Sequence, residues 1–194
     1  MKEKPTFDFL KKHIPNSIKL ADALLIGGFA GSVMELLGKM LFLPNKNANS
    51  TDCIYLFIKK YLSKQNNKYE EYRKIFVHLF RHGGAHSVMP KGGVNITSDP
   101  PSENLHLTIK PDYKSLPLDY FWFTIFLPTF KKDLTNAVLA FASDAENNQT
   151  LQNHYLMVIE SSIKEGNSFL RKMIYKRIYN PDSDYLSLQS DVKA

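Results

Sequence analysis

The 194-residue chain is poor in cysteine and has no long apolar run. Its one cysteine, Cys53, excludes an intramolecular disulfide and a metal site built from several thiolates, which suits a reducing compartment. The longest uncharged apolar segment, residues 23–34, is shorter than the roughly 20 residues that a membrane span requires. Residues 1–13 lack the continuous apolar stretch of a secretory signal. We therefore expect a cytoplasmic protein that does not enter the membrane.

The composition is that of a folded globular protein with a moderate excess of positive charge. Hydrophobic residues make up 43% of the chain and charged residues 23%. No repeat, low-complexity tract or linker divides it, so we expect one helical domain over residues 1–194 with flexible ends at 1–15 and 181–194. The 25 Lys and Arg residues exceed the 19 Asp and Glu residues, which gives a formal net charge of +6. This excess favours a polyanionic partner.

Hydrophobic periodicity predicts a mainly α fold, a helical bundle of about five helices. In the third helix it predicts a buried face at Tyr72, Phe76, Leu79 and Gly83, and in the fourth at Phe130, Leu134, Val138 and Phe141. The expected helices cover residues 18–43 with Asn16 as N-cap, 51–62 with Ser50 or Thr51 as N-cap, 69–81, 130–141 and 151–179. Two short segments, 94–97 and 105–109, alternate like strands around a turn at Asp99-Pro100-Pro101. They predict a short β-hairpin insertion at about residues 92–110. The aromatic cluster at 120–126 indicates core or a subunit interface.

Arg81 and His86, which lie at the expected end of the third helix, form the chain's candidate catalytic pair. A guanidinium can hold a phosphate through two hydrogen bonds, and an imidazole moves protons near neutral pH. On an unbroken helix the two residues are roughly 140° apart. Either Gly83 and Gly84 bend the helix, or two chains pair around a twofold axis so that each completes the other's site.

An arginine followed after four residues by a histidine, late on a helix, resembles the signature of the HEPN superfamily. Segment 83–91 also resembles a Gly-x-x-His-x-x-x-Pro-Lys pattern of uncharacterised bacterial proteins. HEPN proteins are helical bundles, commonly dimeric, and many are metal-independent endoribonucleases of defence or toxin–antitoxin systems. The resemblance implies that Arg81 holds the scissile phosphate, that His86 transfers protons and that His82 is an auxiliary polar residue. It also implies a homodimer and an antitoxin-like protein partner.

Further basic residues are candidate contacts to RNA. Lys91 follows the arginine–histidine pair, and one broad side of the last expected helix carries Lys164, Arg171, Lys172 and Lys176. Two tyrosines interleave with the basic residues of that helix, so the surface could track a phosphate backbone and stack bases. A solvated outer helix face is the alternative explanation of the same pattern.

The sequence leaves three other interpretations of the arginine–histidine segment open. Arg81 could be a surface cation at a helix C-terminus, with His86 closing that helix. His78, His82 and His86 recur every four residues, and neighbouring members could share a metal, although the outer pair is about 12 Å apart along a helix. No carboxylate lies nearby in sequence, so we expect neither a metal nor another cofactor. The same bundle could also be a non-catalytic module that binds RNA, a nucleotide or a protein.

Overall fold

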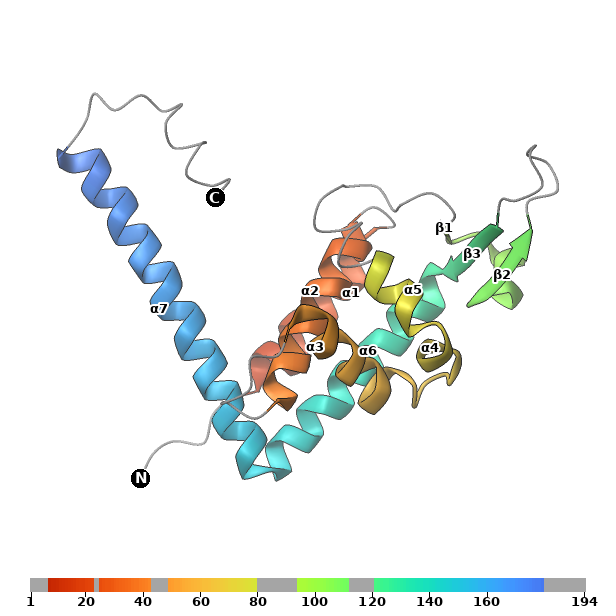
Figure 1. Ribbon diagram of the computed structural model, residues 1–194, viewed down its shortest axis with the longest axis horizontal. Helices are drawn as coiled ribbons and strands as arrows, with labels where there is room; N and C mark the ends of the chain where they lie inside the picture. The colour runs from red at the N-terminus through yellow and green to blue at the C-terminus, as the bar shows by residue number, and fades with distance from the viewer. Residues whose placement is uncertain (1–6, 23–24, 43–48, 80–93, 112–120, 180–194) are drawn as a thin grey trace. The chain divides into compact units, whose positions relative to one another are not determined.

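The computed structural model describes residues 7–22, 25–42, 49–79, 94–111 and 121–179 (Figure 1). Helices dominate these residues and a small three-stranded sheet accompanies them, which confirms the predicted mainly α fold with a short β insertion. The chain divides into two units, Met1–His154 and Tyr155–Ala194, and each is described by itself. The expectation of a single domain stays a prediction.

The first unit contains most of the secondary structure. Its helices are a π-helical turn η1 (Phe9–His13) that continues into α1 (Ile14–Leu20), then α2 (Leu25–Leu41), α3 (Ser50–Phe57) with its π-helical extension η2 (Ile58–Leu62), α4 (Lys68–Glu71), α5 (Arg73–Val77) and α6 (Leu127–Asn147). The face of α6 predicted to be buried is confirmed, because Phe130, Leu134, Val138 and Phe141 are fully buried.

Three of the expected helices differ from the prediction in their ends. The first is two helices, because Ala21 leaves α1 with an extended backbone; Asn16 lies inside α1 and is not its N-cap. Pro15 lies in the first turn of α1, where its missing N–H costs nothing. The cap of α3 is Asn49, whose side-chain oxygen accepts from the Asp52 N–H at 2.9 Å. The third helix breaks at Tyr72, so α4 and α5 are separate.

The predicted β-hairpin is wrong in its pairing. The strands are β1 (Val94–Thr97), β2 (Thr108–Pro111) and β3 (Phe121–Phe126), in the order β1-β3-β2. β3 pairs in parallel with β1 and antiparallel with β2, so the two expected strands are not neighbours. A 3₁₀ helix, η4 (Pro100–Leu105), occupies much of the connection that a hairpin would have used. The expected aromatic cluster supplies the central strand.

That central strand is largely core. Phe123, Ile125 and Phe126 are buried, whereas Trp122 is 39% exposed. Phe123 contacts Phe76 edge-to-face with 5.7 Å between ring centroids. The sheet is thus packed on the helices through aromatic rings from β3 and α5.

Helices α2 and α3 approach each other to backbone contact at Gly38. A Cβ atom placed on Gly38 would lie 2.0 Å from the carbonyl oxygen of Cys53. Only a residue without a side chain fits between the two helices at this point.

Helix α7 (Gln149–Tyr179) includes residues of both units, and it is helical over the range predicted from the sequence as far as the described residues extend. The Asn148 side chain accepts hydrogen bonds from the backbone N–H groups of Thr150 and Leu151 and so caps its first turn. Across the described ranges, none of the helices is both long enough and apolar enough to cross a membrane.

Candidate functional site

The predicted catalytic residues Arg81, His82 and His86, together with Lys91, lie outside the described residues. The helix that leads toward them is described as far as Leu79. Phe76 and Leu79 are buried on the face that the sequence predicted to point inward. The structure therefore supports the orientation of this helix, and the arginine–histidine geometry stays a prediction.

Of the three histidines of the alternative metal site, the structure describes only His78. His78 is exposed, and the other two histidines of the series lie outside the described ranges. Among the residues that the structure does describe, no group of three His, Cys, Asp or Glu side chains could hold a metal ion.

The basic residues predicted on the last helix all lie on α7. Lys164 is exposed to solvent. Arg171, Lys172 and Lys176 belong to the same continuous helix, and their backbone is helical as expected. The phosphate track that they were predicted to form stays a prediction.

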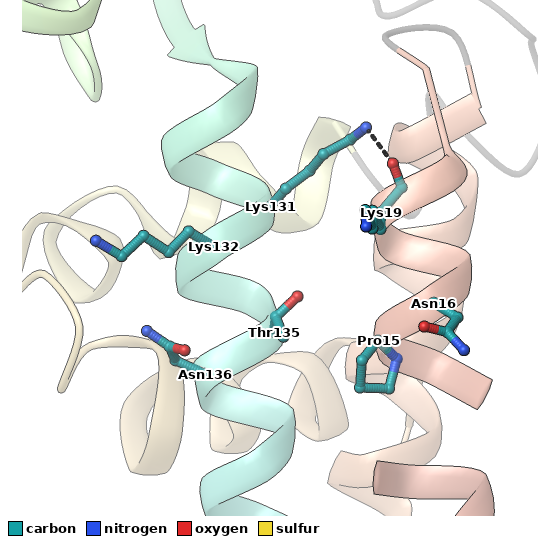
Figure 2. Close-up of a pocket in the computed structure, with 7 residues that line it drawn as sticks. All are labelled: Pro15, Asn16, Lys19, Lys131, Lys132, Thr135 and Asn136. Atoms are coloured by element: carbon teal, nitrogen blue, oxygen red, sulfur yellow. Dashed lines mark hydrogen bonds between the residues drawn. The ribbon is translucent and has the colours of Figure 1, made fainter. Parts of the chain in front are cut away.

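A groove between α1 and α6 gathers three lysines that the sequence did not single out (Figure 2). It has a volume of about 360 Å³ and is lined by Pro15, Asn16, Lys19, Lys131, Lys132, Thr135 and Asn136. The Lys131 ammonium donates to the Lys19 carbonyl oxygen at 3.0 Å and so caps the C-terminal end of α1. Lys132 extends away from α1 (Figure 2). Because the ammonium groups do not converge, we do not assign an anion site to this groove.

Three polar side chains from different elements form a hydrogen-bonded chain, which we call the Tyr69–His106–Asp133 cluster; Tyr69 and His106 are buried and Asp133 is half-buried. Tyr69 comes from α4, His106 from the corner between η4 and β2, and Asp133 from α6. The Tyr69 hydroxyl lies 3.1 Å from His106 Nε2 and donates to Asp133 Oδ2 at 2.9 Å. The backbone N–H of Phe126, at the junction of β3 and α6, donates to His106 Nδ1 at 3.1 Å.

These contacts fix the protonation of the cluster. Because the Phe126 N–H donates to Nδ1, this nitrogen of His106 carries no proton. Its Nε2 therefore bears the hydrogen and donates to the Tyr69 oxygen, which leaves the tyrosine hydrogen for Asp133. The direction of all three hydrogen bonds follows from one backbone donor.

The pKa values of the cluster agree with this arrangement. Burial, together with the nearby Lys68 ammonium, lowers the pKa of His106 to about 4, so the imidazole is neutral at neutral pH. Burial and the Asp133 carboxylate raise the pKa of Tyr69 well above its usual value. Burial also raises the pKa of Asp133, although its bond to Tyr69 and the nearby Lys132 act in the opposite direction.

The backbone beside His106 is strained. Leu107 has a φ of 55°, in the left-handed region that a residue with a branched side chain rarely occupies. Its side chain is fully buried, and its N–H donates to the Thr124 carbonyl oxygen at 2.9 Å. This conformation directs Leu107 into the core and His106 toward Tyr69. The packing of the corner thus maintains a strained turn that positions the cluster.

The Tyr69–His106–Asp133 cluster connects secondary-structure elements and is not accessible to a substrate. Tyr69 is fully buried, His106 is 8% exposed, and both ring nitrogens of His106 are engaged. A substrate would find no free proton donor or acceptor on the imidazole. Sequence reasoning missed the cluster because its members are 37 and 64 residues apart in the chain, and the one local signal was a histidine between two leucines.

Comparisons of the chain with protein-family models, with curated proteins and with solved structures found no match.

Proposed function

We propose that this chain is a HEPN-like, RNA-directed protein that acts as a metal-independent endoribonuclease in a bacterial defence or toxin–antitoxin system. The observation that carries the proposal is the Arg81-x4-His86 spacing in a chain whose fold is mainly α-helical. Net charge of +6 supports an RNA partner, because a polyanion gains from binding a basic surface.

The proposed chemistry assigns a separate role to each side chain. Arg81 holds the scissile phosphate through two hydrogen bonds and stabilises the charge that develops on its oxygens. His86 transfers the proton that leaves the 2′-hydroxyl or the proton that the departing 5′ oxygen gains. The 2′ oxygen bonds to phosphorus as the bond from phosphorus to the 5′ oxygen breaks, so one proton leaves and one is returned. His82 assists as a polar neighbour.

RNA contacts outside the reacting phosphate are proposed for Lys91, Lys164, Arg171, Lys172 and Lys176. Each ammonium or guanidinium that neutralises a phosphate releases a counterion, so binding should weaken steeply with salt. Replacing the exposed Lys164 with alanine should reduce the steepness of that salt dependence by about one phosphate contact and leave cleavage intact.

Cleavage of structured RNA in EDTA tests the proposal. The wild-type chain should cleave, whereas Arg81→Lys and His86→Ala should lose activity. The lysine keeps the charge of Arg81 but cannot form the paired hydrogen bonds. His13→Ala is the matched control, because His13 is exposed on η1 and lies outside the proposed site. RNA binding without cleavage would replace the enzyme with a non-catalytic binding module, and the absence of both would refute the proposal.

The proposed homodimer has its own test. If one chain supplies Arg81 and its partner supplies His86, a mixture of Arg81→Ala and His86→Ala chains contains dimers with one complete site. Such a mixture should recover activity that neither variant has alone. If the glycines instead bring both residues together in one chain, the mixture stays inactive while the wild type cleaves. An antitoxin-like protein partner would be sought by its ability to suppress this activity.

A further inference from the structure

The Tyr69–His106–Asp133 cluster is where the corner between η4 and β2 is held to the helices. Through Nδ1, His106 is bonded to the junction of β3 and α6, and through Nε2 to Tyr69 of α4. The backbone N–H of His106 also donates to the Glu103 carbonyl oxygen at 3.1 Å, which connects the histidine to η4. One imidazole therefore connects the corner to α4 and to the junction of β3 and α6.

We propose that the cluster is an acid-sensitive latch, in which protonation of His106 releases the corner segment, residues 100–111, from α4, α6 and β3. A proton on Nδ1 would face the Phe126 N–H, and two donors cannot form a hydrogen bond with each other. The protonated ring would also be a buried cation. The latch does not depend on the proposed ribonuclease activity.

The charges around His106 oppose its protonation or fail to compensate for it. On α4, the Lys68 ammonium repels a positive ring. On α6, the Asp133 carboxylate lies beyond the Tyr69 hydroxyl and itself gains a proton in acid more readily than an ordinary aspartate, and Lys132 is next to it. On β3, the Phe126 N–H and the Thr124 carbonyl oxygen bond to His106 and Leu107, and these backbone groups carry no net charge that could compensate a protonated ring.

The strained turn favours release once the histidine is charged. The positive φ of Leu107 is tolerated only while its side chain and its N–H are held in the core. If the corner leaves its position, Leu107 can relax to an ordinary conformation. Because burial and Lys68 lower the pKa of His106 to about 4, the latch is closed at neutral pH and opens as the pH falls toward that value.

The chain contains its own reporter for this release. Trp122 is the single tryptophan, and it is paired with Lys110 of β2 within the corner segment. Its fluorescence should therefore respond when β2 leaves β3, while far-ultraviolet circular dichroism follows the helices. On acidification of the full chain, we expect a change in Trp122 emission as the pH falls toward about 4, with the helical signal retained.

Variants identify the group that triggers the change. In His106→Asn the amide oxygen can still accept from the Phe126 N–H, but the side chain no longer titrates, so the Trp122 transition should disappear. Asp133→Asn should keep the transition, and so should His13→Asn, which changes an exposed histidine. Loss of the transition in Asp133→Asn, or its persistence in His106→Asn, would overturn the proposal.

Measurements on the wild-type chain keep the latch falsifiable if His106→Asn does not fold. Nuclear magnetic resonance of the wild-type chain should show that the His106 imidazole titrates well below the usual pKa of a histidine, together with the Trp122 change. An ordinary titration of His106 would contradict the latch. Simultaneous loss of the Trp122 and helical signals would also contradict it, because acid would then unfold the first unit as a whole.

Discussion

Gly38→Ala is the substitution whose effect follows most directly from the structure. The added Cβ would lie 2.0 Å from the Cys53 carbonyl oxygen, 2.4 Å from its carbonyl carbon and 2.7 Å from its Cα. An ordinary van der Waals contact begins near 3.4 Å, so α2 and α3 would have to separate by more than about 1 Å. Because all three contacted atoms belong to the backbone, no change of side-chain rotamer relieves the contact.

The magnitude is the difference between two effects. Alanine is the better helix former and favours the helix by about 1 kcal/mol over glycine. Overpacking in a well-packed core costs about 1–3 kcal/mol, and a rigid backbone neighbour places Gly38 at the upper end. We therefore expect the free energy of unfolding to fall by about 2 kcal/mol. Urea unfolding followed by circular dichroism would measure it.

Gly166→Ala is the matched control for this prediction. Gly166 also lies within a helix, α7, but among the described residues no atom outside its own stretch of helix lies within 4 Å of the position where its Cβ would be. The same substitution there should strengthen the helix by up to about 1 kcal/mol. Adding Cys53→Ala to Gly38→Ala should not restore stability, since the side chain of Cys53 is not what the methyl group meets. Wild-type stability of Gly38→Ala, or its rescue by Cys53→Ala, would refute the reasoning.

Three other predictions concern hydrogen bonds and pH. Tyr69→Phe should lower the free energy of unfolding by about 1–3 kcal/mol because it removes a hydrogen-bond partner from the buried His106 and from the half-buried Asp133, whereas Tyr61→Phe should cost less than about 1 kcal/mol because water can replace its bond to the exposed Asp144. Equal losses in urea unfolding would contradict this. Asn49→Ala should cost about 1 kcal/mol by removing the N-cap of α3, and Asn49→Asp should largely restore it. The free energy of unfolding should be constant above about pH 6.5 and fall by up to about 3 kcal/mol as the pH drops to about 4. In this range His106 binds a proton in the unfolded chain but not in the folded chain. A free energy that does not change with pH would contradict the lowered pKa of His106.

The helices are the part of this protein that local sequence determined best. The spacing of Phe130, Leu134, Val138 and Phe141 predicted the buried face of α6, and the last helix is helical through Tyr179 as expected. Helical periodicity depends on apolar residues three and four positions apart, so it can be recognised without knowing the rest of the fold. Helix ends were less certain because several polar residues near each end could act as the cap, and Asn49 was the one that did.

The candidate ribonuclease site is determined by sequence only as a pattern of residue types. Arg81 and His86 have the spacing of the HEPN signature, but helical geometry alone separates them. Whether they meet depends on the backbone at Gly83 and Gly84 or on a second chain. Those are properties of three-dimensional arrangement, which residue spacing does not specify.

The sheet and the latch were decided by tertiary structure. The two expected strands carried the right alternation, yet β3 lies between them, because strand pairing depends on which distant segment buries its side chains there. In the same way, the Phe126 N–H sets the tautomer of His106, and burial together with Lys68 lowers its pKa; Phe126 and Lys68 both lie far from His106 in sequence. The sequence by itself determined the helical character of the chain and a candidate catalytic pair. Strand order and the Tyr69–His106–Asp133 cluster required the fold, because contacts between distant residues establish both.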